Sequence, residues 1–170
     1  MRQLVVVSIA EMKLSSIVGE TLVTHALGSC IGLAIYDPHA RVGGLLHAML
    51  PSSAQDARKA LENPCTYVDS GVAHLFRESY KLGLQKSRAI VCGAGCASTN
   101  PSQQGSDFFQ IGKRNEIMLR KLLWKNGVML HAADFGGSVS RTLMLDIASG
   151  EVRVKAMMSE TILMEGRKNG

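Results

Sequence analysis

The stretch IGLAIYDPHARVGGLLHAML, from Ile31 to Leu50, decides the fold. Its first six residues form an apolar run with β-branched and aromatic members, which is typical of a buried strand. Asp37 and Pro38 then favour a turn, because proline presets φ and aspartate bonds to the backbone that follows it. The second apolar run, which begins at Arg41, predicts the returning strand. We therefore expect this stretch to form a buried β-hairpin.

Two side chains that carry chemistry lie beside this hairpin. Cys30 directly precedes the first strand and follows Gly28 and Ser29, whereas His47 lies in the returning strand, three residues after Gly44. A thiol and an imidazole are the minimum set for covalent acyl transfer. The hairpin folds His47 back toward Cys30 despite their sequence separation of 17 residues. The pattern favours a nucleophile and its base.

The chemistry explains why these two residue types occur together. A free cysteine has a pKa of about 8.5, so it needs a neighbouring base to become a thiolate near neutral pH. Histidine can take that proton and later give it to a leaving group, because its pKa lies near physiological pH. Alone, Cys30 would be interpreted as a small buried hydrophobe and His47 as a hydrogen-bonded structural residue. Together they favour catalysis, with the Gly28 and Ser29 turn supplying backbone N–H groups for an oxyanion.

Hydrophobic periodicity predicts many strands and three helices in mixed order. Strands are expected at residues 3–14, 20–27, 31–36, 41–50, 88–93, 128–133, 142–147 and 151–157, and helices at 54–61, 67–82 and 115–125. Residues 95–106 form a polar stretch that predicts a loop. This order indicates an α/β layered sandwich of the α+β type, with mixed or antiparallel β-sheets flanked by about three helices.

Length and composition indicate one domain. We assign residues 1–159 to the domain and residues 160–170 to a C-terminal tail that is frayed or forms a short helix. The chain has 170 residues, a formal net charge of +5 and four cysteines. No nucleic-acid motif accompanies the scattered positive charges, and no apolar stretch approaches the length of a transmembrane helix. The chain is therefore expected to be cytoplasmic, with its cysteines as thiols, no nucleic-acid partner and no membrane insertion.

The remaining cysteines raise the alternative of a metal or redox site. Cys92 and Cys96 have loose zinc-ligand spacing, and Cys65 and His74 could complete a ligand set. No second close pair of ligands is present, although structural zinc sites usually need one. We therefore expect no metal and no cofactor.

Several segments together resemble the chemoreceptor glutamine deamidases of the CheD family. The segment THALGSC at residues 24–30, the YDP turn at 36–38 and GGLLHAMLP at 43–51 resemble the family's nucleophile and base segments. Downstream, IGKRN at 111–115 is similar to the family's Ile-Gly-x-Arg-Asn, and DFGG at 134–137 precedes an arginine. The resemblance extends from about residue 20 to residue 155.

The resemblance implies a role for each matching residue. The family's nucleophile falls on Cys30, its base on His47 and its supporting hydroxyl on Thr24, which would hydrogen-bond the second ring nitrogen of the histidine. Gly28, Ser29, Gly44 and Asn115 are expected to shape the site or its oxyanion hole. The implied reaction converts glutamine to glutamate with release of ammonia through a cysteine thioester. The implied partners are chemoreceptor cytoplasmic helices as substrate and a CheC-type chemotaxis phosphatase.

Two other classes of function remain open from the sequence. A non-catalytic adaptor could bind the chemoreceptor or the phosphatase with a relict site, although an adaptor would not need to keep Cys30, His47 and Thr24. A thiol-based redox or metal protein would instead use Cys92 and Cys96.

Overall fold

A computed structural model describes residues 1–98 and 110–167 and contains two five-stranded sheets. Sheet A has the order β1 (Gln3–Val6), β3 (Glu20–Leu27), β8 (Arg141–Asp146), β9 (Val152–Ala156) and β10 (Ser159–Met164). Sheet B has the order β2 (Glu11–Ser15), β5 (Val42–Ala48), β4 (Ile31–Asp37), β6 (Ile90–Gly95) and β7 (Ala132–Phe135). The α-helices are α1 (Ala57–Glu62), α2 (Val68–Lys81) and α3 (Ile111–Lys125). Short 3₁₀ helices occupy Ser53–Gln55, Pro64–Thr66 and Lys86–Arg88.

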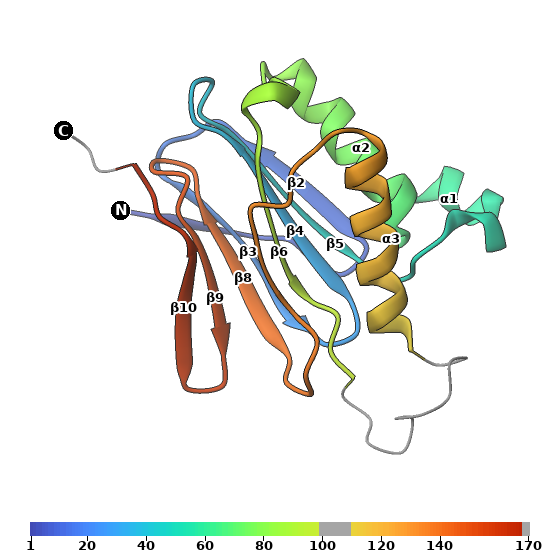
Figure 1. The fold of residues 1–170 in the computed structure, drawn as a ribbon. Helices are drawn as coiled ribbons and strands as arrows, with labels where there is room; N and C mark the ends of the chain where they lie inside the picture. The colour runs from blue at the N-terminus through green and yellow to red at the C-terminus, as the bar shows by residue number, and fades with distance from the viewer. Residues whose placement is uncertain (99–109, 168–170) are drawn as a thin grey trace.

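The two sheets face each other, and α2 and α3 cover the outer face of sheet B (Figure 1). One hydrophobic core lies between the sheets and includes Leu22, Leu45 and Leu143. A second lies between sheet B and the helices and includes Leu46 and Leu75. Strands β4 and β5 are buried along their whole length because sheet B is covered on both faces. The predicted layered α+β sandwich is confirmed.

The alternation along β5 decides where its histidine points. Leu45 belongs to the core between the sheets, whereas Leu46 belongs to the core under the helices. Successive side chains of a strand point to opposite faces, so His47 shares the face of Leu45. A Cβ at Gly44 would meet Leu14 and Leu75 on the helix side. The side chain of His47 therefore points between the sheets, into the interior of the sandwich.

The predicted hairpin is confirmed, because β4 and β5 pair antiparallel from Ile31 to Ala48. The single strand predicted at residues 3–14 is wrong. The chain turns at Ala10, whose φ is 56°, and β1 and β2 enter different sheets. The strand predicted at residues 128–133 is β7, which begins only at Ala132.

The tail is also corrected, because residues 159–164 form strand β10 and not a frayed or helical end. It pairs antiparallel with β9, and Leu163 and Met164 pack against the core between the sheets. The connecting turn contains Met157 at φ 53° and lacks the Asn-Gly or Gly signal that would have predicted a hairpin. Most of the loop predicted at residues 95–106 lies outside the described residues; Gly95 itself ends β6.

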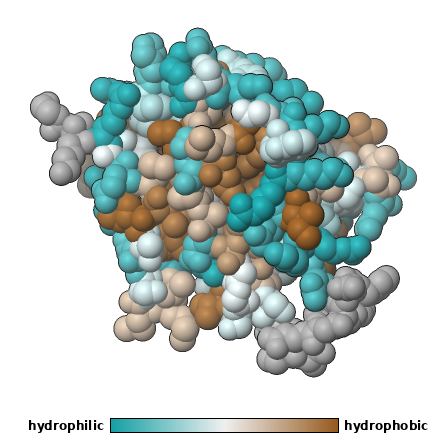
Figure 2. Space-filling view, in the orientation of Figure 1, coloured by the Kyte–Doolittle hydropathy of each residue, from teal (hydrophilic) through white to brown (hydrophobic). Residues whose placement is uncertain are grey.

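Strand ends that are distant in the sequence meet at one end of the sandwich. The end of β3, the start of β4, the end of β6, the start of β8 and the start of α3 lie together at the lower end in Figure 1. Figure 2, in the orientation of Figure 1, shows patches of apolar residues among polar ones on the side that faces the viewer. Met157 and Met158, in the β9–β10 turn, are 76% and 99% exposed.

Within residues 1–98 and 110–167, no helix is long and apolar enough to cross a membrane.

Candidate active site

A buried chain of hydrogen bonds connects the two sheets at His47. The Nδ1 atom of His47, on β5, lies 2.8 Å from the hydroxyl oxygen of Thr24, on β3. The same hydroxyl donates to the carbonyl oxygen of Val7 at 2.7 Å. Thr24 is fully buried and His47 is 3% exposed. The contact expected between the threonine and the second ring nitrogen of the histidine is therefore present.

This chain fixes the tautomer of the histidine. A hydroxyl has a single hydrogen, and Thr24 gives it to Val7, so its oxygen must accept from His47. The proton of the neutral imidazole is therefore on Nδ1, which leaves a lone pair on Nε2. Nε2 is buried and has no hydrogen-bond partner among the described residues. The imidazole is oriented to accept a proton at Nε2.

The same surroundings keep His47 neutral. Burial lowers its pKa from 6.5 to about 4, because an imidazolium loses solvation inside the protein. Thr24 is a neutral partner and does not compensate for that loss as a carboxylate would. Near neutral pH the ring is therefore an uncharged base.

The sheet register places Cys30 beside His47. Gly32 pairs with His47 and Ile31 pairs with Ala48. Cys30 lies two residues before Gly32, hence on the same face and diagonal to His47; such neighbours are about 7–8 Å apart at Cα and somewhat closer at Cβ. Cys30 is half-buried and packs against the core between the sheets. The thiol and the imidazole thus share one face of sheet B.

The thiol of Cys30 is protonated in its resting state. Burial raises its pKa, and the nearby backbone N–H of Cys30 lowers the pKa by less. Burial therefore favours the neutral forms of both the thiol and the imidazole.

The turn before Cys30 is held by its carbonyl groups. The Gly28 oxygen accepts from the Ala97 N–H at 2.8 Å, and the Cys30 oxygen accepts from the Cys96 N–H at 2.9 Å. Ala26, with φ 55°, starts the tight reversal of the chain. The turn is therefore fastened to the strand extension that follows β6, and its position does not depend on solvent-exposed contacts.

Asn115 fastens the remaining carbonyl group of this turn. Its Nδ2 atom donates to Ser29 O at 2.9 Å and to Met49 O at 3.0 Å, and the residue is fully buried. One amide thus joins the turn before Cys30 to the segment that follows His47. Its Oδ1 atom has no partner within the described residues. Asn115 Oδ1 and His47 Nε2 are the two buried side-chain atoms without a partner there, and both belong to this region.

Gly44, which we expected to shape the site, is not brought to it. The space above its Cα is filled by Leu14 and Leu75, on the helix side of sheet B. His47 is three residues later and therefore points to the opposite face. The glycine allows close packing of the core under the helices. Gly28, Ser29 and Asn115, by contrast, do lie around Cys30.

Arg141 organises the rim at the same end of the sandwich. It is 8% exposed and pairs with Asp134, with its Nη2 atom 3.1 Å from Oδ1. Its Nη1 atom also donates to the carbonyl oxygens of Gly95 and Val139, at 3.3 and 3.1 Å. A guanidinium presents several donors in one plane, so a single side chain can hold three chain segments together.

The other cysteines do not form a common site. Cys92 belongs to the core between the sheets, whereas Cys65 and Cys96 belong to the core under the helices. Burial raises the pKa of Cys92 to about 11 and that of Cys96 to about 12. Thiols on opposite faces of a sheet cannot bind one metal ion. In the part of the chain that the structure describes, no group of three or more metal-ligating residues occurs.

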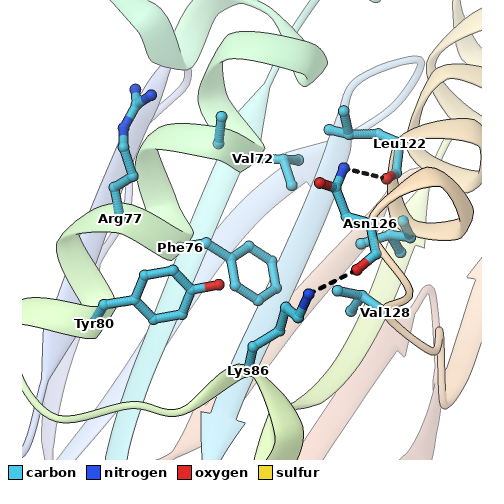
Figure 3. A pocket seen from close by; sticks show the side chains of 10 residues that line it. Val72, Phe76, Arg77, Tyr80, Lys86, Leu122, Asn126 and Val128 are labelled. Atoms are coloured by element: carbon cyan, nitrogen blue, oxygen red, sulfur yellow. Dashed lines mark hydrogen bonds between the residues drawn. The ribbon is translucent and has the colours of Figure 1, made fainter.

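The apolar groove between the helices is separate from this chemistry (Figure 3). It has a volume of about 240 Å³ and is lined by residues that include Val72, Phe76, Leu122 and Val128. Lys86 closes one side and donates to the carbonyl oxygen of Asn126, as Figure 3 shows. None of the residues predicted for the site lines the groove. Two shallow surface depressions share Arg141 and Met157, and the residues that line them do not include Cys30 or His47.

Val7 is the member of the site that sequence reasoning missed. It contributes only its backbone carbonyl oxygen, which determines the direction of the Thr24 hydroxyl. The Val7 N–H in turn donates to Val23 O at 2.8 Å, so the strand pairing fixes this carbonyl. A backbone acceptor has no side-chain signature, and no pattern in the sequence could have revealed it.

Comparisons with known proteins agree on one family. The CheD family model, described as CheD chemotactic sensory transduction, matches residues 49–156. A protein of Syntrophus aciditrophicus named probable chemoreceptor glutamine deamidase CheD 1 is 47% identical over 152 residues, which cover 89% of this chain and 93% of that protein. A probable chemoreceptor glutamine deamidase CheD of Solibacter usitatus is 43% identical over 148 residues, covering 87% and 86%. A protein of Thermococcus kodakarensis with the same name is 38% identical over 142 residues, covering 82% and 85%.

The extent of these matches decides the assignment. The family model covers more than half of the chain, and the relatives align over most of their own length. A shared fragment or a single motif would not produce such coverage. The chain belongs to the CheD family.

Proposed function

We propose that this protein is a glutamine deamidase that acts on chemoreceptors in chemotaxis, with Cys30 as nucleophile and His47 as base. The observation that carries the proposal is the buried hydrogen-bond chain from Val7 through Thr24 to His47, which leaves Nε2 free on the face shared with the thiol. The names of the relatives support the substrate class. The family match begins at residue 49, so the proposed roles of these residues rest on geometry.

The first chemical step forms a thioester. His47 Nε2 takes the proton of the Cys30 thiol as the sulfur attacks the carbonyl carbon of the glutamine side chain. A carbon–sulfur bond forms, and the carbonyl π electrons move onto oxygen. We assign the Cys30 N–H to the stabilisation of that oxyanion, because the backbone N–H of a nucleophilic residue is a common donor of an oxyanion hole.

The intermediate then collapses and releases ammonia. The carbon–nitrogen bond breaks, and the imidazolium gives its proton to the departing nitrogen. A water molecule, deprotonated by the same histidine, attacks the thioester and releases glutamate and the thiol. Overall, the reaction consumes one water molecule and releases one ammonia molecule, and the enzyme is regenerated. No cofactor or metal ion takes part in the scheme.

The exposed surface around Arg141 suits the approach of a protein substrate. A protein substrate needs an open surface, and the exposed Met157 and Met158 lie beside the depressions that contain Arg141. Methionine side chains adapt to irregular partners. We therefore propose that the chemoreceptor helix approaches over this end of the sandwich, in the cytoplasm. Membership of the family also supports a CheC-type phosphatase as a second partner.

The test is mass spectrometry of a chemoreceptor cytoplasmic fragment incubated with the protein. Wild type should convert defined glutamines to glutamates, whereas Cys30→Ala and His47→Ala should leave them intact. Cys65→Ala is the matched control, because that thiol is buried in the core under the helices, away from the site. It should retain activity.

An unchanged substrate with wild type would support the adaptor alternative instead. In that case the fragment should still bind, and Cys30 should show no more reactivity toward iodoacetamide than an ordinary half-buried thiol. A reactive Cys30 without deamidation would mean that the nucleophile is correct and the substrate class is wrong. Activity that survives Cys30→Ala would refute the proposed nucleophile.

A further inference from the structure

One peptide group connects Asn115 to the reaction centre. The Ser29 carbonyl that accepts from Asn115 Nδ2 belongs to the same peptide unit as the Cys30 N–H. That unit is planar, and in a trans peptide the carbonyl and the N–H point in opposite directions. The structure contains no cis peptide bond among its described residues. A donor that holds the Ser29 oxygen on one side therefore directs the Cys30 N–H to the other side.

We propose that Asn115 is a positioning residue of the deamidase, which holds the Ser29–Cys30 peptide so that the Cys30 N–H faces the oxyanion. This inference rests on the proposed function and names a residue that acts through the backbone, not through substrate contact. Removal of Asn115 should slow the steps that create an oxyanion and spare the reactivity of the thiol itself.

The orientation of the Asn115 amide is unambiguous. Both of its partners, Ser29 O and Met49 O, are acceptors, so the nitrogen and not the oxygen must face them. Reversal of the amide would place its oxygen against two carbonyl oxygens inside the protein. This arrangement leaves the Asn115 Oδ1 atom buried without a hydrogen-bond partner among the described residues. A buried acceptor without a partner costs stability, and such exceptions concentrate where function requires them.

The start of α3 is packed closely enough to hold this amide in place. A Cβ at Gly112 would lie 2.6 Å from the Cys96 carbonyl oxygen and 2.8 Å from that of Ala97, so only glycine allows the helix to approach this far. Asn115 follows one turn later, on the buried face with Leu119. The Cys30 oxygen is held by the Cys96 N–H on the other side of the nucleophile. The two peptide units around Cys30 are thus fixed independently.

The experiment compares two reactions at Cys30. Acylation by p-nitrophenyl acetate passes through a tetrahedral oxyanion, whereas alkylation by iodoacetamide is a displacement at saturated carbon and forms none. Asn115→Ala should slow acylation by at least about tenfold, since one oxyanion donor is worth about 10²–10³ in kcat. Alkylation at Cys30, followed on the peptide by mass spectrometry, should change little. For the chemoreceptor fragment, kcat should fall by at least the same factor, with KM nearly constant.

The matched control is Leu119→Ala, which removes buried volume from the same helix face without touching the Ser29 carbonyl. It should lower the midpoint of urea unfolding while both reactions keep their wild-type ratio in the folded protein. Equal loss of acylation and alkylation in Asn115→Ala would overturn the proposal, because a merely structural role moves both. So would unchanged acylation.

The two reagents also separate this inference from the proposed function. Neither reagent requires a chemoreceptor, so the ratio of acylation to alkylation tests Asn115 even if wild type leaves every glutamine intact. In that case the deamidase proposal fails, and the ratio of acylation to alkylation still decides whether Asn115 has a positioning role.

Discussion

The titration of His47 should control stability as well as catalysis. Its pKa in the folded protein is about 4, against 6.5 for an ordinary histidine. Between these values the unfolded chain binds a proton that the folded protein does not bind. The free energy of unfolding should therefore fall as the pH falls from about 6.5 to about 4. The difference between the two pKa values corresponds to roughly 3 kcal/mol, at 1.36 kcal/mol for each pH unit.

The measurement is urea denaturation of wild type and His47→Gln across this pH range. Glutamine cannot titrate, so the difference in unfolding free energy between the two proteins isolates His47 from the other histidines, which both share. The wild-type protein should lose roughly 3 kcal/mol more than the variant between about pH 6.5 and about pH 4. The titration of Asp37 does not interfere with this comparison, because its pKa in the folded protein lies below the pH range measured. Burial raises the pKa of this carboxyl group, but Arg88 and the N–H groups of Gln85, Ala40 and His39 together lower it to about 2.

The same titration should appear in catalysis. The proposed mechanism needs an unprotonated Nε2, so the acid limb of kcat/KM should fall near pH 4 and not near pH 6.5. Parallel stability curves for wild type and His47→Gln would refute the reasoning, because a neutral buried imidazole must titrate differently from an exposed one. An acid limb near pH 6.5 would refute it as well.

Three further substitutions test separate parts of the structure. Thr24→Asp should raise the pKa of His47, because a carboxylate stabilises the imidazolium; Cys30 alkylation should then become faster at acidic pH while deamidation slows, and a parallel gain in both rates would contradict the scheme. Asp37→Asn should cost about 2 kcal/mol in urea unfolding, because Arg88 loses its buried partner, yet kcat should stay unchanged. Gly95→Ala should cost about 2 kcal/mol and lower kcat, because φ at this position is 111° and the added Cβ would overlap the Cys30 carbonyl oxygen; wild-type stability and rate would exclude that overlap.

The parts of the fold that the sequence predicted are those set by local chemistry. The β4–β5 hairpin follows from Asp37 and Pro38 between two apolar runs, and the structure pairs it from Ile31 to Ala48. The parts that failed depend on tertiary contacts. Residues 3–14 look like one strand until Ala10 diverts the chain into the other sheet, and β10 forms because β9 offers it an edge.

The candidate site divides in the same way. Cys30 precedes the first strand of one hairpin and His47 lies near the end of its second strand, so local pattern and pairing register place both at the open end and on one face. The direction of the Thr24 hydroxyl depends on Val7, and the direction of the Cys30 N–H depends on Asn115, 85 residues further along the chain. Contacts of that kind arise from the packing of sheet on sheet and helix on sheet. No local pattern encodes them.

A neutral hydroxyl behind the base suits the removal of ammonia. A carboxylate at the position of Thr24 would make His47 a stronger base and help to form the thiolate, but the imidazolium would then be a weaker acid. With a pKa of about 4, the histidine is a weak base toward the thiol and, once protonated, a strong acid toward the departing nitrogen. Amide nitrogen leaves readily only when it is protonated, so the second property assists the harder step. The weakness of the base slows attack by the sulfur. The Cys30 N–H, held in place through Asn115, can compensate for this loss by stabilising the oxyanion.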